Sequence, residues 1–471
     1  LFINNQFVDS VSGKKFPTLN PANGKKIADI AEGDKKEMIL KPQNFDILQE
    51  TIDKVNKQIF SHMLADLIER DLMVLATLES IDNGKPFGFS QFDMMFSVKT
   101  LRYYAGLADK VHGHTIPSDG AVFSFTRKEP VGVVGQIIPW NGPAVMMCWK
   151  IAPVLATGCT TVIKPAEQTP LTALHIAALT KEAGVPDGVI NIITGYGPTA
   201  GAAISSHPDI GKVAFTGSTE FQKIIMAAAA KSNLKKVSLE LGGKSPLVIF
   251  GDADIDYAVK VAHEALFFNQ GEVCCAGSRT FVHESIYDEF VKKATEMAKK
   301  RKVGDAFTEG VEHGPQIDDE IFTRILSFIE RGKCEGAKLE CGGERLGNEG
   351  FFIKPTVFSN VTDDMDIAKE EIFGPVQCII KFKTLEEAIE RANKTSYGLA
   401  AGVITKDINT ALVFAQSVEA GSVWVNTYNH FSPQNPFGGY KQSGLGRELG
   451  FDSLDEYLET KTVTIQMPYK L

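Results

Sequence analysis

The sequence has 471 residues, too many for one ordinary hydrophobic core, which predicts roughly two to four domains or fewer domains with large insertions. Hydrophobic residues make up 44% and charged residues 23%, a balance typical of a globular protein rather than a disordered or fibrous one. The net charge of -9 works against binding to nucleic acid, which depends on concentrated Lys and Arg. We therefore expect no nucleic-acid partner.

Membrane and metal signals are also missing from the sequence. No run approaches the roughly 18 apolar residues of a membrane span, and residues 1–20 lack the pattern of a signal peptide, so we expect no membrane association. Seven cysteines without a CxxC pair favour reduced thiols in the cytoplasm over a disulfide framework or a zinc site, and we expect no metal. Because the chain opens at Leu1 without Met, import into mitochondria stays an alternative.

Residues 131–240 alternate short β-rich runs with helical segments, the pattern of a parallel sheet. Between the second and third runs, Thr169 is predicted to cap a helix that begins at Pro170 and ends at Gly184. Ligands of such sheets lie beyond the carboxyl ends of the strands, so the residues after each run are candidate site residues. The runs are VGVVGQII, TTVIK, GVINII, KVAFTG and KVSLEL.

The alternation begins again after Gly243 and indicates a second α/β domain, with the run PLVIF, a helix over about 254–268 and the loop NQGEVCCAGSR. Two strand-like segments far apart in sequence, GAVFSFTRKEP and TKTVTIQM, predict an arm that a partner subunit completes. Residues 36–63 are predicted to form a helix broken at Pro42.

Three side chains could share a reaction. Cys274, in a polar loop after Gly271, is a candidate nucleophile, although adjacent cysteines are more often small core residues. Glu240 ends an apolar strand and suits a general base or, equally, a buried ion-pair partner. The amide of Asn141 could donate to a developing oxyanion or could belong to a simple turn before Gly142.

Taken together, eight segments in order resemble the aldehyde dehydrogenase superfamily, in particular the class 1 and class 2 animal enzymes. The similarity extends from about Leu64 to the end and more loosely over residues 1–34. It implies an α/β aldehyde dehydrogenase fold with a Rossmann-like NAD-binding domain, an α/β catalytic domain and a small β oligomerisation arm. The segments are PWN, IKPAEQTPLTAL, GYGPTAGAAI, VAFTGSTE, LELGGKSP, FFNQG with CCAGSR, KEEIFGPV and PFGGYKQSGLGRELG.

The resemblance also implies domain boundaries and an assembly. It places the NAD-binding domain at residues 1–110 and 131–242, the catalytic domain at 243–445, and the arm at 111–130 and 455–471. It implies a homodimer or a homotetramer. The implied reaction is NAD-dependent oxidation of an aldehyde to the carboxylic acid through a thiohemiacetal and a thioester on cysteine.

Roles for single residues follow from the same resemblance. Cys274 falls at the nucleophile position because it stands three residues after Gly271, and Glu240 falls at the general-base position. Asn141 and the backbone N–H of Cys274 would form the oxyanion hole.

The cofactor residues are implied in the same way. Lys164 and Glu167, which alone read as a solvated surface pair, would hold the adenosine ribose hydroxyls, and a carboxylate there favours NAD over NADP because it repels a 2′-phosphate. The others are Trp140, Gly217 and Ser218 along the cofactor path, and Glu371 and Phe373 at the nicotinamide ribose.

The sequence departs from the family at two positions and one segment. Gln222 replaces the last glycine of Gly-x-Thr-x-x-Gly, which predicts weaker NAD⁺ binding. Gly142 replaces a phenylalanine of the substrate tunnel and predicts a wider mouth. Residues 36–63 are shortened, which could alter NAD⁺ access. The remaining tunnel wall points to a hydrophobic aldehyde and consists of Met146, Trp149, Phe268, Val273, Phe431 and Phe437.

These departures support a second hypothesis of a different class. Omega-crystallins of mollusc lenses resemble the same enzymes, so the chain could be a structural lens protein with little or no activity. The retained Cys274, Glu240 and Asn141 favour the working enzyme.

Overall fold

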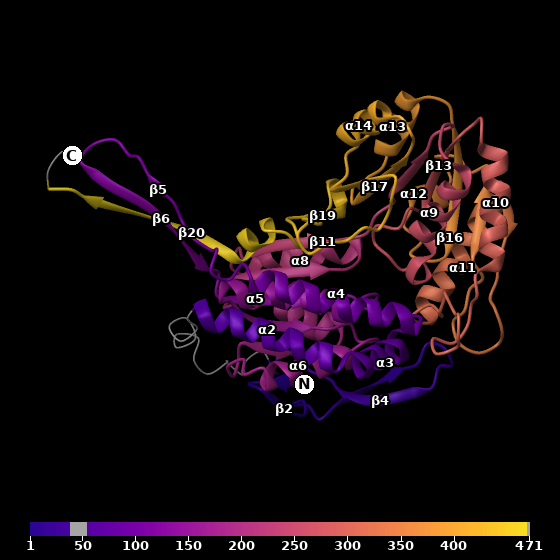
Figure 1. Cartoon of the computed structure of the whole chain (residues 1–471). Helices are drawn as coiled ribbons and strands as arrows, with labels where there is room; N and C mark the ends of the chain where they lie inside the picture. The colour runs from indigo at the N-terminus through magenta and orange to yellow at the C-terminus, as the bar shows by residue number, and fades with distance from the viewer. Residues whose placement is uncertain (38–53, 469–471) are drawn as a thin grey trace.

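The computed structural model describes residues 1–37 and 54–468, and the described part contains two large sheets, a three-stranded arm and a two-stranded sheet (Figure 1). The two-stranded sheet pairs β3 (Lys15–Leu19) with β4 (Lys26–Ala31). The predicted helix break at Pro42 lies outside the described residues. None of the described helices is long and apolar enough to cross a membrane.

The first sheet has the strand order β19-β11-β10-β7-β8-β9-β1-β2. Its strands from β11 to β9 are parallel, and they are the five runs predicted from the sequence. Most of their side chains are buried, as expected where helices cover both faces of a parallel sheet. The strands are β1 (Phe2–Ile3), β2 (Gln6–Phe7), β7 (Val133–Ile137), β8 (Thr160–Lys164), β9 (Ile190–Ile192), β10 (Lys212–Thr216), β11 (Lys236–Glu240) and β19 (Gly444–Leu445).

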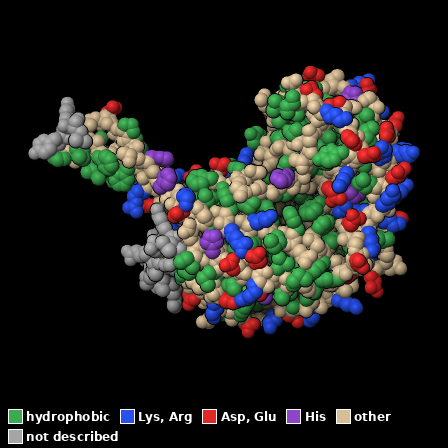
Figure 2. Space-filling view, viewed as in Figure 1, with side chains coloured by type: hydrophobic (Ala, Val, Ile, Leu, Met, Phe, Trp, Pro, Cys, Tyr) green, Lys and Arg blue, Asp and Glu red, His purple; other side chains and the backbone are tan. Residues whose placement is uncertain are grey.

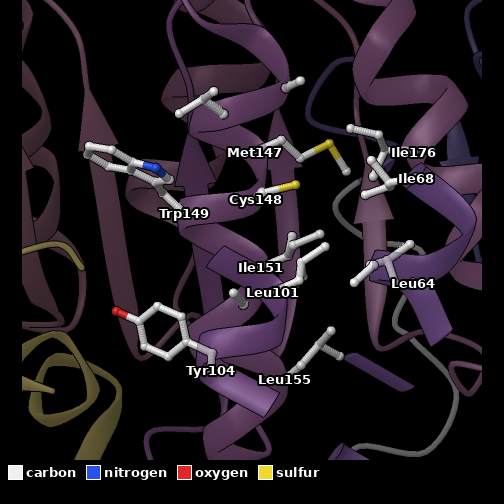
Figure 3. Packing of buried hydrophobic residues seen from close by; sticks show 14 of the residues in the cluster. Leu64, Ile68, Leu101, Tyr104, Met147, Cys148, Trp149, Ile151, Leu155 and Ile176 are labelled. Atoms are coloured by element: carbon white, nitrogen blue, oxygen red, sulfur yellow. The ribbon is translucent and has the colours of Figure 1, made fainter. Parts of the chain in front are cut away.

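The helices around this sheet pack into two apolar clusters, one shared by α2 to α6 and the other formed with η2, α7 and α8. Helix α5 is apolar on every side apart from Lys150, so it is buried along nearly its whole length. Figure 3 shows Met147 and Ile151 of α5 directed toward α2 and α6, whereas Trp149 points to the opposite side. The helices are α2 (Lys54–Arg70), α3 (Leu72–Asn83), α4 (Phe87–Ala105), α5 (Pro143–Thr157), α6 (Leu171–Glu182), η2 (Gly197–Gly201), α7 (Ala202–Ser206) and α8 (Thr219–Ser232).

The start of α6 differs from the prediction. The helix begins at Leu171, and the hydroxyl of Thr169 makes no capping hydrogen bond. Instead, the N–H of Leu171 donates to Oδ2 of Asp82, 2.9 Å away, at the end of α3. The capping prediction for Thr169 is wrong because a carboxylate from a distant helix satisfies the same group.

The second sheet has the order β14-β15-β16-β13-β12-β17-β18 and is parallel apart from β14. Its strands are β12 (Pro246–Ile249), β13 (Arg279–His283), β14 (Lys338–Cys341), β15 (Thr356–Ser359), β16 (Val376–Phe382), β17 (Ala400–Ile404) and β18 (Ser422–Val425). Its helices are α9 (Ile255–Phe267), α10 (Tyr287–Lys300), α11 (Asp319–Cys334), α12 (Asp366–Lys369), α13 (Leu385–Asn393) and α14 (Ile408–Ser417). The predicted strand PLVIF and the helix after it are confirmed.

Four of the described helices of the second sheet, α9, α11, α13 and α14, begin after a residue whose side chain caps the helix. Asp254, Asp318, Thr384 and Asp407 each accept a backbone N–H from the first turn of the helix that follows. Such caps satisfy donors that a helix start otherwise leaves free, typically worth about 1 kcal/mol each. The loops at the sheet edge are thus tied to rigid helix starts.

The arm is a sheet of β5 (Thr115–Ile116), β6 (Val122–Pro130) and β20 (Leu458–Gln466). The two strand-like segments predicted from the sequence pair with each other, antiparallel, from Leu458 opposite Pro130 to Gln466 opposite Val122. Figure 1 shows this ribbon projecting away from the body of the molecule. Its outer part therefore lacks a core of its own within the chain.

Candidate active site

A cavity of about 330 Å³ collects the predicted catalytic side chains from separate parts of the fold. Cys274, Glu240 and Asn141 all line it, and most of its surface is apolar. The predicted tunnel residues also line it, namely Gly142, Met146, Trp149, Phe268, Val273, Phe431 and Phe437. An apolar pocket with a few converging polar groups is the usual form of a small-molecule site.

Cys274 reaches the cavity through a strained turn. Helix α9 runs into η3 (Phe268–Gly271), where Asn269 and Gln270 have positive φ angles of 48° and 58°. Gly271 follows with φ +76°, and a Cβ there would lie 2.3 Å from the backbone oxygen of Gly374, so this turn requires glycine. Left-handed backbone at non-glycine residues is costly and clusters at functional sites.

The structure distinguishes the two adjacent cysteines. Cys274 is part-buried and lines the cavity, whereas Cys275 is fully buried, and its thiol donates to Oδ1 of Asn429 at 3.5 Å. The adjacent Cys275 thiol, burial and the charge of Glu240 raise the pKa of Cys274 well above its usual value. The side chains around Cys274 therefore favour its neutral thiol over the thiolate.

Glu240 is the last residue of β11 and is buried, and its Oε1 makes no hydrogen bond to another described residue. Burial raises the pKa of Glu240 to about 7, although the Cys274 thiol and the Lys150 ammonium favour its charged form. A carboxyl group with a pKa near neutrality can both accept and release a proton, which suits a general base.

Asn141 follows β7 in the loop that leads into α5. Its Nδ2 donates to the backbone oxygen of Glu272, 2.9 Å away, two residues before Cys274. An amide carries two N–H donors, so this bond fixes the side chain and leaves the second donor for a ligand in the cavity.

A buried charged network behind Glu240 was missed by sequence reasoning. Nζ of Lys150 donates to Oγ1 of Thr216 at 2.8 Å and forms an ion pair with Glu448. Burial lowers the pKa of Lys150 to about 7, although Glu240 opposes this. A single lysine inside the apolar run MMCWKIAPV was the available sequence signal, since lysine is almost never fully buried without a partner.

Four of the predicted cofactor residues, Lys164, Glu167, Gly217 and Ser218, lie at the carboxyl ends of strands of the first sheet. Gly217 and Ser218 line the cavity after β10, and Ser218 makes no side-chain cap to α8. The free N–H groups of such a helix start suit an anion such as a diphosphate. A Cβ on Gly217 would lie 2.5 Å from the ring of Phe215, so glycine is required at the approach to this helix. Gln222 is buried in α8 but does not line the cavity.

Lys164 and Glu167 lie outside the cavity, Lys164 as the last residue of the parallel strand β8 and Glu167 three residues later. Nζ of Lys164 donates to Oε2 of Glu167 at 2.9 Å and to the backbone oxygen of Pro165 at 3.1 Å. The partly exposed carboxylate of Glu167 offers acceptors to a ribose diol. With the uncapped α8 start, this pair fits a dinucleotide laid along the sheet edge.

The remaining predicted cofactor residues surround the inner end of the cavity. Trp140 and Phe373 meet edge to face, with ring centroids 5.3 Å apart. Oε1 of Glu371 accepts the N–H of Gly243 at 3.0 Å, and burial raises the pKa of Glu371 to about 7. A Cβ on Gly242 would lie 2.1 Å from the Glu371 carboxylate, so any larger residue there would displace this side chain.

Comparison with known proteins identifies the family of this chain. The sequence model described as the aldehyde dehydrogenase family matches residues 7–463. The chain belongs to the aldehyde dehydrogenase family. It is 59% identical to "Aldehyde dehydrogenase" of Enchytraeus buchholzi over all of this chain and 96% of that protein, and 60% identical to "Aldehyde dehydrogenase 1A1" of Gallus gallus over all of this chain and 94% of that protein.

A solved structure and a further sequence relative agree with this family and fold. An "NAD+ complex structure of aldehyde dehydrogenase from bacillus cereus" has a TM-score of 0.97 at 48% identity and covers 99% of this chain and 96% of that one. "Retinal dehydrogenase 2" of Homo sapiens is 57% identical over all of this chain and 92% of that protein. The predicted family and fold class are confirmed.

Proposed function

We propose that this aldehyde dehydrogenase oxidises a hydrophobic aldehyde to the carboxylic acid with NAD⁺ as the acceptor. The observation that carries the proposal is the meeting of Cys274, Glu240 and Asn141 at one apolar cavity beside an uncapped helix start. A lens protein selected only for its abundance has no need of this arrangement, so the enzyme is favoured over a crystallin.

The residues would act in sequence. The sulfur of Cys274 forms a bond to the aldehyde carbon as its proton passes to the Glu240 carboxylate, to which the thiol is hydrogen-bonded, and the carbonyl oxygen gains negative charge next to the free N–H of Asn141. When bound, NAD⁺ accepts the hydride that leaves the carbon as the thiohemiacetal becomes a thioester. Glu240 releases that proton to solvent and then takes one from water as the water oxygen attacks the thioester carbon. The C–S bond breaks, the carboxylic acid leaves, and Glu240 returns the proton to the sulfur of Cys274.

The cavity wall supports the class of substrate. A Cβ on Gly142 would lie 3.8 Å from Met146 and 4.0 Å from Val145, which are ordinary contact distances, and Gly142 lines the cavity, so a side chain added there would extend into it. Aromatic side chains form much of the remaining wall, including Phe268, Phe431 and Phe437. These features favour a bulky apolar aldehyde.

The predicted domain roles extend the proposal. Residues 1–110 and 131–242 would bind NAD⁺, residues 243–445 would supply the nucleophile loop, and residues 111–130 and 455–471 would join copies into a homodimer or homotetramer. Strand β19 belongs to residues 243–445 but pairs with β11 of the first sheet, and so it links the two proposed domains. A cytoplasmic location is supported by a Mus musculus relative, 58% identical, named "Aldehyde dehydrogenase, cytosolic 1".

The decisive experiment compares the two cysteines. NADH formation is followed with acetaldehyde, hexanal and retinal for the wild type, Cys274→Ala and Cys275→Ala. Wild type and Cys275→Ala should form NADH, whereas Cys274→Ala should form none. The proposed function is wrong if folded wild type forms no NADH with any of the three aldehydes.

A further inference from the structure

A buried cluster of charges lies beneath the loop that carries Asn141. Lys85, which is 1% exposed, lies between α3 and α4. Its Nζ donates to Oε1 of Glu79 at 3.0 Å, to Oδ2 of Asp93 at 2.6 Å and to the backbone oxygen of Asn141 at 3.0 Å. An ammonium group has three N–H donors, so these three partners account for all of them.

The same segment of chain holds the neighbours of Asn141. Nδ2 of Asn83 donates to the backbone oxygen of Trp140 at 2.8 Å. Oε2 of Glu79 accepts the N–H of Ala144 in the first turn of α5 at 3.2 Å. Side chains at and just before Lys85 therefore bind the backbone at positions 140, 141 and 144.

A second set of bonds joins this loop to the nucleophile loop. Nδ2 of Asn269 donates to the backbone oxygen of Asn141 at 3.0 Å, and Nδ2 of Asn141 donates to the backbone oxygen of Glu272 at 2.9 Å. The backbone oxygen of Asn141 therefore accepts two donors, of which Lys85 is the charged one. Charge-assisted hydrogen bonds are shorter and stronger than neutral ones, so Lys85 is the firmer of the two anchors.

The cation at this position is well compensated. Burial opposes the charge of Lys85, but Asp93 and Glu79 outweigh burial, and the pKa of Lys85 is raised. The side chain is therefore an ammonium at neutral pH. Because Asp93 also lines the cavity, the charged cluster reaches from the helix core to the substrate space.

We infer that Lys85 is a positioning residue that holds Asn141 so that its free side-chain N–H faces the carbonyl oxygen of a substrate on Cys274. The inference rests on the proposed function and adds a residue that does not touch the substrate. If Lys85 only stabilised the helices, its loss would lower stability but would not depend on Asn141.

The test is a double-mutant cycle on the rate of the first turnover, measured as the initial burst of NADH. Asn141→Ala should slow the burst roughly 100- to 1000-fold, the usual cost of one oxyanion donor. Lys85→Met should slow it at least ~10-fold in the wild-type background and less than ~2-fold in the Asn141→Ala background, because the group it positions is gone. Equal slowing in both backgrounds would overturn the inference, as would an unchanged burst in Lys85→Met alone.

Two further variants guard against loss of folding. Because Lys85→Met leaves the buried carboxyl group of Glu79 and the part-buried one of Asp93 without their cation, a companion variant adds Glu79→Gln and Asp93→Asn, and it should show the same dependence on Asn141. Lys212, on β10, is a matched control, since it is also fully buried and its Nζ forms an ion pair with Glu456 at 3.3 Å. Lys212→Met should lower the melting temperature and leave the burst rate within ~2-fold.

The inference and the proposed function fail in different ways. A wild type that forms no NADH refutes the proposed function itself. An active wild type in which both Lys85 variants keep the full burst rate refutes only the positioning role.

Discussion

At the residue scale, Glu240 sets the expected pH dependence of the final step. Burial raises its pKa to about 7, and only the carboxylate can take a proton from water. Hydrolysis of the thioester should therefore be slow at acidic pH, rise through about pH 7 and level off above it. An activated ester acylates Cys274 without hydride transfer, so the release of its acyl group measures this step directly.

The control for this prediction is Glu371, whose pKa burial also raises to about 7. Glu240→Gln should release the acyl group at least ~100-fold more slowly, with no inflection near neutrality. Glu371→Gln should keep the inflection, because its carboxylate accepts the N–H of Gly243 rather than serving the thioester. If the inflection survives in Glu240→Gln and disappears in Glu371→Gln, the general base is Glu371 and not Glu240.

Gly142 provides a second prediction at the same scale. Its φ of -143° is open to any residue, and the nearest atoms to a Cβ lie at ordinary contact distances, so Gly142→Phe should fold normally. The new ring would fill the cavity mouth and should lower kcat/KM for retinal roughly 10- to 200-fold, while kcat/KM for acetaldehyde should change less than ~3-fold. Parallel loss with both aldehydes would contradict a role in substrate size.

At the element scale, α8 follows β10 at the proposed cofactor site. Gln222 is buried in its second turn, where the family motif has glycine, and this predicts weak NAD⁺ binding. Gln222→Gly should tighten NAD⁺ binding about 10-fold by calorimetric titration, despite a helix cost of roughly 0.5–1 kcal/mol. Lys223→Gly, on the exposed side of α8, carries the same helix cost and should leave NAD⁺ affinity unchanged. Ordinary micromolar NAD⁺ binding by the wild type would count against this prediction.

The strands of the first sheet could be predicted from the sequence, whereas contacts between residues far apart in the chain could not. The five parallel strands were predictable because each is a short apolar run between turn residues, and two candidate catalytic residues lie at or after their ends. The roles of Lys85 and Lys150 were not predictable, because their partners Asn141 and Glu448 are 56 and 298 residues away. The cap of α6 failed in the same way, since Asp82 comes from another helix.

At the scale of the whole molecule, the cavity depends on two sheets that are built from long, separate stretches of chain. Glu240 and Asn141 come from the edge of the first sheet, and Cys274 comes from the loop that enters β13 of the second. Strand β19 returns from the far end of the sequence to pair with β11, where Gly444 lies opposite Glu240. The backbone of Glu240 is therefore held by a strand from a distant part of the sequence.

The arm carries the last prediction, which concerns assembly. Phe123 and Ile465 lie directly opposite each other on β6 and β20 and are 43% and 47% exposed. Figure 2 shows hydrophobic side chains gathered on this projecting ribbon, and an isolated two- or three-stranded ribbon with exposed apolar side chains gains stability only by packing on something else.

If the arm joins copies as proposed, Phe123→Asp with Ile465→Asp should convert the proposed homo-oligomer to monomer, as measured by light scattering after size-exclusion chromatography. Thr462→Asp places the same charge on β20 at an exposed position already polar, and it should leave the assembly largely intact. The cavity is lined by residues of one chain, so the monomer should still bind NAD⁺, but it should unfold at a lower temperature because the contacts between copies are missing. A wild type that is monomeric, or a double variant that assembles normally, would show that the arm has another role.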